Sequence, residues 1–209
     1  GEDGYVTALT SGQYADWEPS FTAEKYEKFA YSSYFGFQTA RGYNQLHLTA
    51  PDNMLAFLRD GLYHVRRKCQ KTVCREDAIE SVWSPMEGVT VETQISPCGK
   101  GHTRKHRIHA DRPCTAVEGG FPLPVHDPEE VRAQKCENQI SISGTYGSSR
   151  IKLLEGQGKA GWLMCEPNVN VLHPRSGIPY FSYEIPQGIT EICVYVEGIP
   201  ANVCRDAAD

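Results

Sequence analysis

Long apolar runs are missing from this chain of 209 residues. No stretch comes near the roughly 18 consecutive apolar residues that a membrane-spanning helix requires, so we expect no membrane segment. The first letters, GEDGYV, contain neither a basic start nor an apolar core, so no signal peptide is visible in this chain. The sequence predicts a soluble protein.

Common signatures of nucleotide binding and covalent catalysis are also missing. The chain contains no P-loop and no GxSxG sequence, and we expect no cofactor. None of its eight cysteines forms a CxxC pair of the kind that indicates a zinc site. Cys69 and Cys74 could bridge each other or bind a metal, but free cysteine is more often an ordinary buried thiol. The net charge of −5 argues against general nucleic-acid binding.

Helical periodicity is scarce, and a short helical turn within 128–133 is the one helix that the sequence predicts. Short stretches of strand-forming residues recur at spacings near ten, separated by Gly, Pro and Asn. Asp60-Gly61 between two of them predicts a β-hairpin, because Asp-Gly readily adopts the positive φ angles of a two-residue turn. We expect strands at 4–12, 25–37, 54–58, 62–66, 78–83, 89–95, 139–143, 150–154, 162–165, 180–185 and 190–197. The pattern predicts an all-β fold with little helix, a large antiparallel, supersandwich-like β-sandwich over 1–209 as a single domain.

Histidine and arginine gather in the stretch 101–121, which otherwise has the character of a strand. Alternate positions place His102, Arg104 and His106 on one side and mostly cationic side chains on the other, so no apolar face is visible. We therefore expect this strand to bury almost nothing. It lies on a solvated face, or it faces a polar ligand or a second domain across a wet interface. Arginine can hold a carboxylate and histidine can exchange protons near neutral pH, but two histidines without a third ligand predict no metal site.

A second candidate lies in 166–175. Asn168 and Asn170 share one side of the chain there, and His173 and Arg175 flank a proline. Asparagine commonly stitches a loop to its own backbone, and the alternative is contact with a ligand.

Two further features concern the aromatic stretch Lys25–Phe37 and Glu118. One face of the aromatic stretch is suited to the core, while Lys28 and Tyr34 on the other face could bind and stack on a sugar. Packing alone is the alternative. Glu118 is followed by two glycines, which indicate a bulge or a close backbone approach, and it could form an ion pair with the basic strand.

Six motifs resemble those of a known family. In chain order they are ALTSGQ, KYEKFAYSSYFGF, DGLYHVRRK, SVWSPMEGVTVET, HTRKHRIHADRP followed by EGGF, and PNVNVLHPR. Together they resemble the C-terminal half of the bacterial and fungal proteins called domain of unknown function 2264. The resemblance covers nearly the whole chain.

The resemblance implies a larger enzyme. Members are similar to glycoside hydrolase family 154, in which an N-terminal (α/α) toroid precedes an antiparallel β-sandwich and to which activity on β-glucuronides has been assigned. The layout is also similar to that of heparinase-type and chondroitin-type lyases. By this resemblance the chain is an accessory, non-catalytic domain of a glycoside hydrolase acting on uronic-acid glycans. It packs against a toroid that this sequence lacks, and by itself it turns over no substrate.

The resemblance and the residue patterns give nine positions for contact with substrate or with the second domain, with Arg104 as the expected contact to a sugar carboxylate. These positions are Lys28, Tyr34, His102, Arg104, His106, Asn168, Asn170, His173 and Arg175. The expected partners are the toroid and an acidic glycan, with no nucleic acid and no membrane. The alternative is a stand-alone carbohydrate-binding or protein-interaction module.

Overall fold

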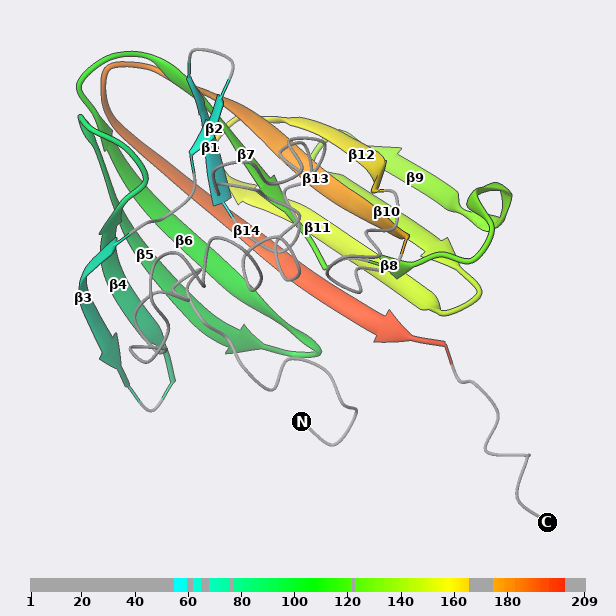
Figure 1. The fold of residues 1–209 in the computed structure, drawn as a ribbon. Coiled ribbons are helices and arrows are strands. Elements are labelled where there is room, and N and C mark those ends of the chain that lie inside the picture. The colour runs from blue at the N-terminus through cyan, green and yellow to red at the C-terminus, as the bar shows by residue number, and fades with distance from the viewer. Residues whose placement is uncertain are drawn as a thin grey trace, which may run out of the picture.

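The structure, a computed structural model, describes residues 55–59, 62–64, 68–75, 77–121, 123–165 and 175–201. These residues form two antiparallel sheets that pack face to face (Figure 1), with one short 3-10 helix at Pro128–Glu130. No helix in this part of the chain is long and apolar enough to cross a membrane. The predicted all-β sandwich is confirmed. The helical turn predicted at 128–133 is confirmed over Pro128–Glu130, whereas Arg132 and Ala133 belong to the next strand. The strands expected at 4–12 and 25–37 lie outside the described residues.

The larger sheet has eight strands in the order β3-β4-β5-β6-β14-β11-β10-β9. Their bounds are β3 Lys68–Cys74, β4 Ile79–Ser84, β5 Val89–Cys98, β6 Gly101–Ala110, β9 Arg132–Cys136, β10 Gln139–Gly144, β11 Gly147–Glu155 and β14 Gly188–Pro200. Successive antiparallel pairs link β3 to β6 and β9 to β11, and β14 lies between these two runs. The basic strand β6 is therefore an interior strand with a neighbour on each side.

The smaller sheet has the order β12-β13-β7-β1-β2, and β8 pairs with β13. Its bounds are β1 Leu55–Arg59, β2 Leu62–His64, β7 Cys114–Gly119, β8 Leu123–Pro124, β12 Lys159–Cys165 and β13 Ser176–Ile185. Arg59 pairs with Leu62, so two residues separate β1 from β2 and the predicted hairpin is confirmed.

The core lies between the two sheets. From the larger sheet, the alternate positions Val91, Ile95 and Val194 are buried, as the period-two pattern of their strands predicts. From the smaller sheet, Phe57 and Phe181 are buried opposite them. Val91 and Val194 from the larger sheet and Phe57 and Phe181 from the smaller one belong to the same apolar cluster. Its burial is the main source of stability expected for a sandwich of this size.

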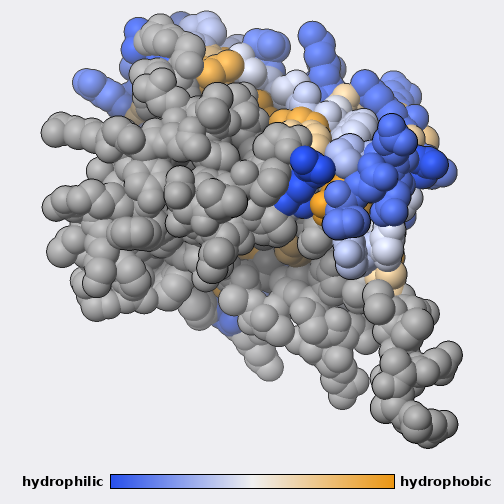
Figure 2. Space-filling model, turned by 45° about the vertical axis from the view of Figure 1, so that its right-hand side comes forward, coloured by the Kyte–Doolittle hydropathy of each residue, from blue (hydrophilic) through white to orange (hydrophobic). Residues whose placement is uncertain are grey.

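The edge of the larger sheet at β9 is strongly polar. All five residues of β9 are exposed, and Arg132 and Lys135 are among them. On the described part of the face drawn in Figure 2, hydrophilic side chains predominate and apolar ones form only small spots. Charged side chains on an edge strand disfavour pairing with strands of other molecules.

Candidate functional site

The basic strand β6 is built into the interior of the sandwich. His102, Arg104 and His106 point between the sheets, with exposed fractions of 1%, 4% and 2%. Ile108 and Ala110 continue the same buried face. The expectation that this stretch buries almost nothing is wrong. An interior strand of the larger sheet must turn one face to the smaller sheet, and here polar partners rather than apolar ones meet that face.

Glu118 on β7 reaches Arg104 from the opposite sheet. Arg104 Nη1 donates to Glu118 Oε1 over 3.1 Å and to the carbonyl oxygen of Gly119 over 3.1 Å. Glu118 is fully buried. The predicted ion pair between Glu118 and the basic strand is confirmed, and it joins the two sheets directly.

His106 on β6 links Glu118 on β7 to Thr93 on β5 and, through Thr93, to Trp83 on β4. Its Nε2 lies 2.9 Å from Glu118 Oε1, and its Nδ1 lies 2.9 Å from Thr93 Oγ1. Trp83 Nε1 donates to the same hydroxyl over 2.8 Å. Because an indole can only donate, Thr93 accepts from Trp83 and can donate to His106 Nδ1. In the neutral form of His106, Nε2 then carries the proton and donates to Glu118.

His102 contacts a different nitrogen of the Arg104 guanidinium from the one that binds Glu118. Arg104 Nε donates to His102 Nε2 over 2.9 Å, so the neutral imidazole carries its proton on Nδ1. The ring packs edge-on against Phe121, with centroids 5.5 Å apart. Burial, with the charge of Arg104 as a smaller cause, lowers the pKa of His102 from 6.5 to about 2. His102 is therefore neutral in the folded protein at ordinary pH.

The charge state of Glu118 follows from competing effects. Burial acts to raise the pKa of the Glu118 carboxyl, but His106 and Arg104 together hold that pKa below its usual value. Glu118 is thus ionised beside the guanidinium of Arg104. We call the connected set the inter-sheet network; its members are Trp83, Thr93, His102, Arg104, His106 and Glu118.

Substitution of the central hydroxyl tests this connectivity. Thr93→Val keeps the shape of the side chain but leaves Trp83 Nε1 and His106 Nδ1 without their partner. We expect a loss of about 1–3 kcal/mol in the free energy of unfolding, measured by chemical denaturation. Thr90→Val on the outer face of the same strand is the control, and we expect it to change stability by less than about 0.5 kcal/mol. Equal losses for the two variants would contradict the hydrogen-bond chain.

In the structure Arg104 does bind a carboxylate, but it is the carboxylate of Glu118 in the same chain. Contact of His102, Arg104 and His106 with a substrate or a second domain stays a prediction. Their burial between the sheets favours a role in holding the two layers together.

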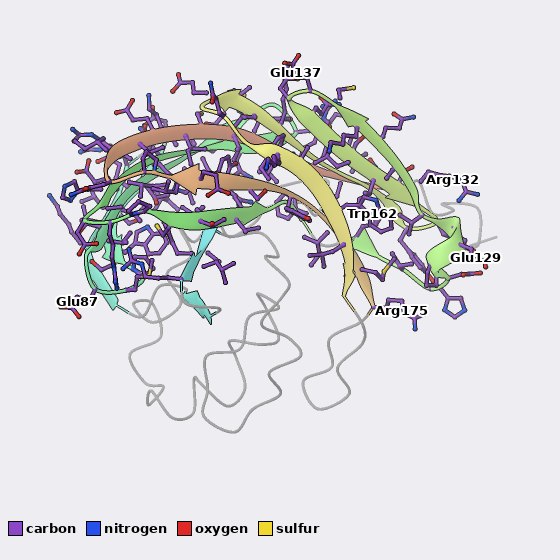
Figure 3. The ribbon with its side chains drawn as sticks, turned by 90° about the horizontal axis from the view of Figure 1, so that it is seen from above. Glu87, Glu129, Arg132, Glu137, Trp162 and Arg175 are labelled. Atoms are coloured by element: carbon purple, nitrogen blue, oxygen red, sulfur yellow. The ribbon has the colours of Figure 1, made fainter. Side chains whose placement is uncertain are left out.

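Of the second candidate segment, 166–175, the structure describes Arg175 alone. Arg175 immediately precedes β13, and its carbonyl oxygen accepts from the backbone N–H of Val125 over 2.9 Å. Figure 3 shows Arg175 at the opposite end of the sandwich from Glu87 in the β4–β5 turn. The remaining predicted positions lie outside the described residues; they are Lys28, Tyr34, Asn168, Asn170 and His173.

A groove of about 300 Å³ lies on the outer face of the larger sheet, and the sequence predictions did not include it. Its charged lining residues are Lys71, Glu80, Glu92, Lys105, Arg107 and Glu191. Arg107 lies between two carboxylates, 3.8 Å from Glu92 and 3.6 Å from Glu191. The alternation of β6 contained part of the signal, because Arg107 is one of its outward positions; its cross-strand partners are Glu92 on β5 and Glu191 on β14. The groove is a polar surface with charges of both signs.

A GxGxxG spacing is present at Gly156, Gly158 and Gly161. A dinucleotide site needs this spacing between a strand and a helix, but here it joins β11 to β12. A Cβ atom on Gly158 would lie 2.8 Å from the ring of Tyr183, and one on Gly161 would lie 2.7 Å from the ring of Tyr180. These two glycines make room for tyrosines, so packing accounts for them without a cofactor.

The family model of the DUF2264 C-terminal domain matches residues 2–207. The chain belongs to this family. No curated protein matches it in sequence. The predicted family resemblance is therefore confirmed over almost the entire chain.

Solved structures share the fold of this DUF2264 C-terminal domain at low sequence identity. Heparinase III is 12% identical with a TM-score of 0.53, and the match covers 87% of this chain and 29% of that one. The heparan sulfate lyase HepC from Pedobacter heparinus is 11% identical, with a TM-score of 0.50 and coverage of 73% and 24%. The 4-alpha-glucanotransferase from Thermococcus litoralis is 13% identical, with a TM-score of 0.50 and coverage of 70% and 27%. The chain thus spans less than a third of each of these larger proteins.

Proposed function

We propose that this chain is an accessory β-sandwich domain of a carbohydrate-active enzyme and that it packs against a separate catalytic toroid. The observation that carries the proposal is the shared fold with heparinase III, in which the matched region is 29% of the chain. The inter-sheet network agrees with an accessory role. Its titratable side chains are buried against one another, whereas a general acid or base must reach the bond that it cleaves.

The proposed substrate class is a glycan that contains uronic acid. The heparan sulfate lyase among the similar structures supports an acidic glycan, and the resemblance to glycoside hydrolase family 154 supports β-glucuronides. Carboxyl groups of the toroid would supply the acid and base for hydrolysis of the glycosidic bond. This domain would supply the surface on which the toroid is held.

The test compares this chain with a longer protein in which the proposed toroid precedes it. Both are incubated with uronic-acid oligosaccharides, and the products are identified by mass. We expect cleavage by the longer protein and none by this chain alone. Cleavage by the chain alone would contradict the accessory role, and inactivity of the longer protein on every glycan would contradict the proposed enzyme class. Products lighter by one water would indicate elimination instead of hydrolysis.

The groove on the outer face favours a second candidate, a glycan-binding module. Arg107 at its centre is half exposed, and the two neighbouring carboxylates lie at the long end of ion-pair distances, so its guanidinium can turn to a sugar carboxylate. If the chain is such a module, calorimetric titration with uronic-acid oligosaccharides shows binding that Arg107→Ala abolishes. Arg132→Ala on the exposed edge strand β9 is the charge-matched control. Absence of binding to the unaltered chain would rule out this candidate.

A further inference from the structure

The two buried histidines of the inter-sheet network have opposite surroundings. His106 contacts the carboxylate of Glu118. His102 contacts the guanidinium of Arg104. A proton on His106 therefore meets a negative group, whereas a proton on His102 meets a positive one.

Among the described residues, the charged group that faces His102 is Arg104 on its own strand. The cross-strand partners of His102 are Pro97 on β5 and Val196 on β14, and neither side chain titrates. From the side of the smaller sheet, Phe121 packs against the ring. The carboxylate of Glu118 is bound to Arg104 and His106 instead.

Protonation of His102 is incompatible with the intact network. A proton on Nε2 would face the N–H of Arg104 Nε across 2.9 Å. The hydrogen bond would be lost, and two positive charges would be in contact in the interior, where little water screens them. His102 can accept a proton only after it leaves this place and reaches water.

We propose that the inter-sheet network makes the contact between the two sheets pH-sensitive: it holds the sheets together at neutral pH, and mild acid weakens this hold because His102 binds a proton whenever it leaves the network. The hydrogen bond from Arg104 breaks first, the proton then passes from solvent to Nε2 of the imidazole, and the protonated ring can no longer accept from Arg104. Acid also weakens the network at Glu118, because this carboxylate is protonated in more acidic solution and then loses its ion pair with Arg104.

The pH window follows from the two states of His102. Its pKa is about 2 in the folded protein and has the ordinary value of 6.5 in the unfolded chain. The unfolded chain therefore binds one more proton between these values, so the stabilisation is complete above 6.5 and falls as the pH falls. Each pH unit below 6.5 raises the unfolding equilibrium constant by about tenfold. The lowered pKa of Glu118 adds a further loss below its ordinary value of 4.5.

The test is the pH dependence of unfolding in the full chain, measured with denaturant between about pH 7.5 and pH 5. His102→Gln keeps an oxygen that can accept from Arg104 Nε but cannot titrate. Relative to this variant, the unaltered chain is expected to gain about tenfold in unfolding equilibrium constant for each pH unit below 6.5. His109→Gln on the exposed face of β6 is the control, and it should keep the steep dependence. The same slope for His102→Gln and the unaltered chain would overturn the proposal.

A second measurement remains decisive if His102→Gln does not fold. The imidazole resonances of the unaltered folded chain are followed by NMR over the same pH range. We expect the resonances of His102 to remain those of a neutral imidazole down to about pH 5. Titration of His102 in the folded state near pH 6.5 would overturn the proposal.

Discussion

Glu118→Gln is expected to lower the free energy of unfolding by about 3–5 kcal/mol, because it leaves the buried charge of Arg104 without a counter-ion. The carboxylate is fully buried and contacts both Arg104 and His106. Chemical denaturation at neutral pH measures the loss. Glu92→Gln is the matched control, since Glu92 is exposed and lies 3.8 Å from Arg107, and we expect a change of less than about 1 kcal/mol.

A double substitution distinguishes the ion pair from packing at the same place. Arg104→Met with Glu118→Leu removes both charges and retains apolar volume. We expect the double variant to be more stable than the sum of the two single losses predicts, by more than about 1 kcal/mol, because neither charge is left unpaired. Additive losses would show that the two side chains do not depend on each other.

Gly101→Ala is expected to destabilise the protein by about 3 kcal/mol, the upper part of the usual range for overpacking. A Cβ atom at this position would lie 2.0 Å from the carbonyl oxygen of Val196 and 2.9 Å from the Cβ atom of Glu197. The obstructing oxygen belongs to the backbone of β14, so the pairing of β6 with β14 must shift to make room for the added methyl group. Denaturation with urea measures the effect.

Gly144→Ala provides the comparison for this substitution. Gly101 is the first residue of β6 and Gly144 is the last residue of β10, in the same sheet. A Cβ atom on Gly144 would meet nothing closer than Leu123 Cδ2 at 3.7 Å. We expect it to be neutral or slightly stabilising, because alanine reduces the freedom of the unfolded chain. Similar losses for Gly101→Ala and Gly144→Ala would contradict the steric explanation.

Local sequence signals predicted much of the fold. Short stretches of strand-forming residues between Gly, Pro and Asn located most of the described strands, and Asp60-Gly61 located the hairpin between β1 and β2. These features depend on neighbouring residues, so the sequence shows them directly. The sandwich class followed from the number and spacing of the strands.

The burial of β6 could not be read from the strand itself. Its position in the sheet depends on β14, which lies about 80 residues later, and its polar partner Glu118 belongs to the other sheet. One signal did exist. Thr93 shares the buried side of β5 with Val91 and Ile95, and a hydroxyl in an apolar row requires a polar partner inside the core. That row indicated that the facing residues of a neighbouring strand would be polar as well.

The position of β14 has a consequence for how the domain is made. This strand is the last one described, yet it lies in the middle of the larger sheet, where it pairs with β6 on one side and β11 on the other (Figure 1). During synthesis, the strands β3 to β6 and β9 to β11 emerge first, as two separate groups with unpaired edges. The two groups cannot join into the larger sheet until residues 188–200 have left the ribosome, because β14 is the strand that pairs with both of them. In that interval β6 and β11 each have an unpaired edge that could pair with strands of other chains.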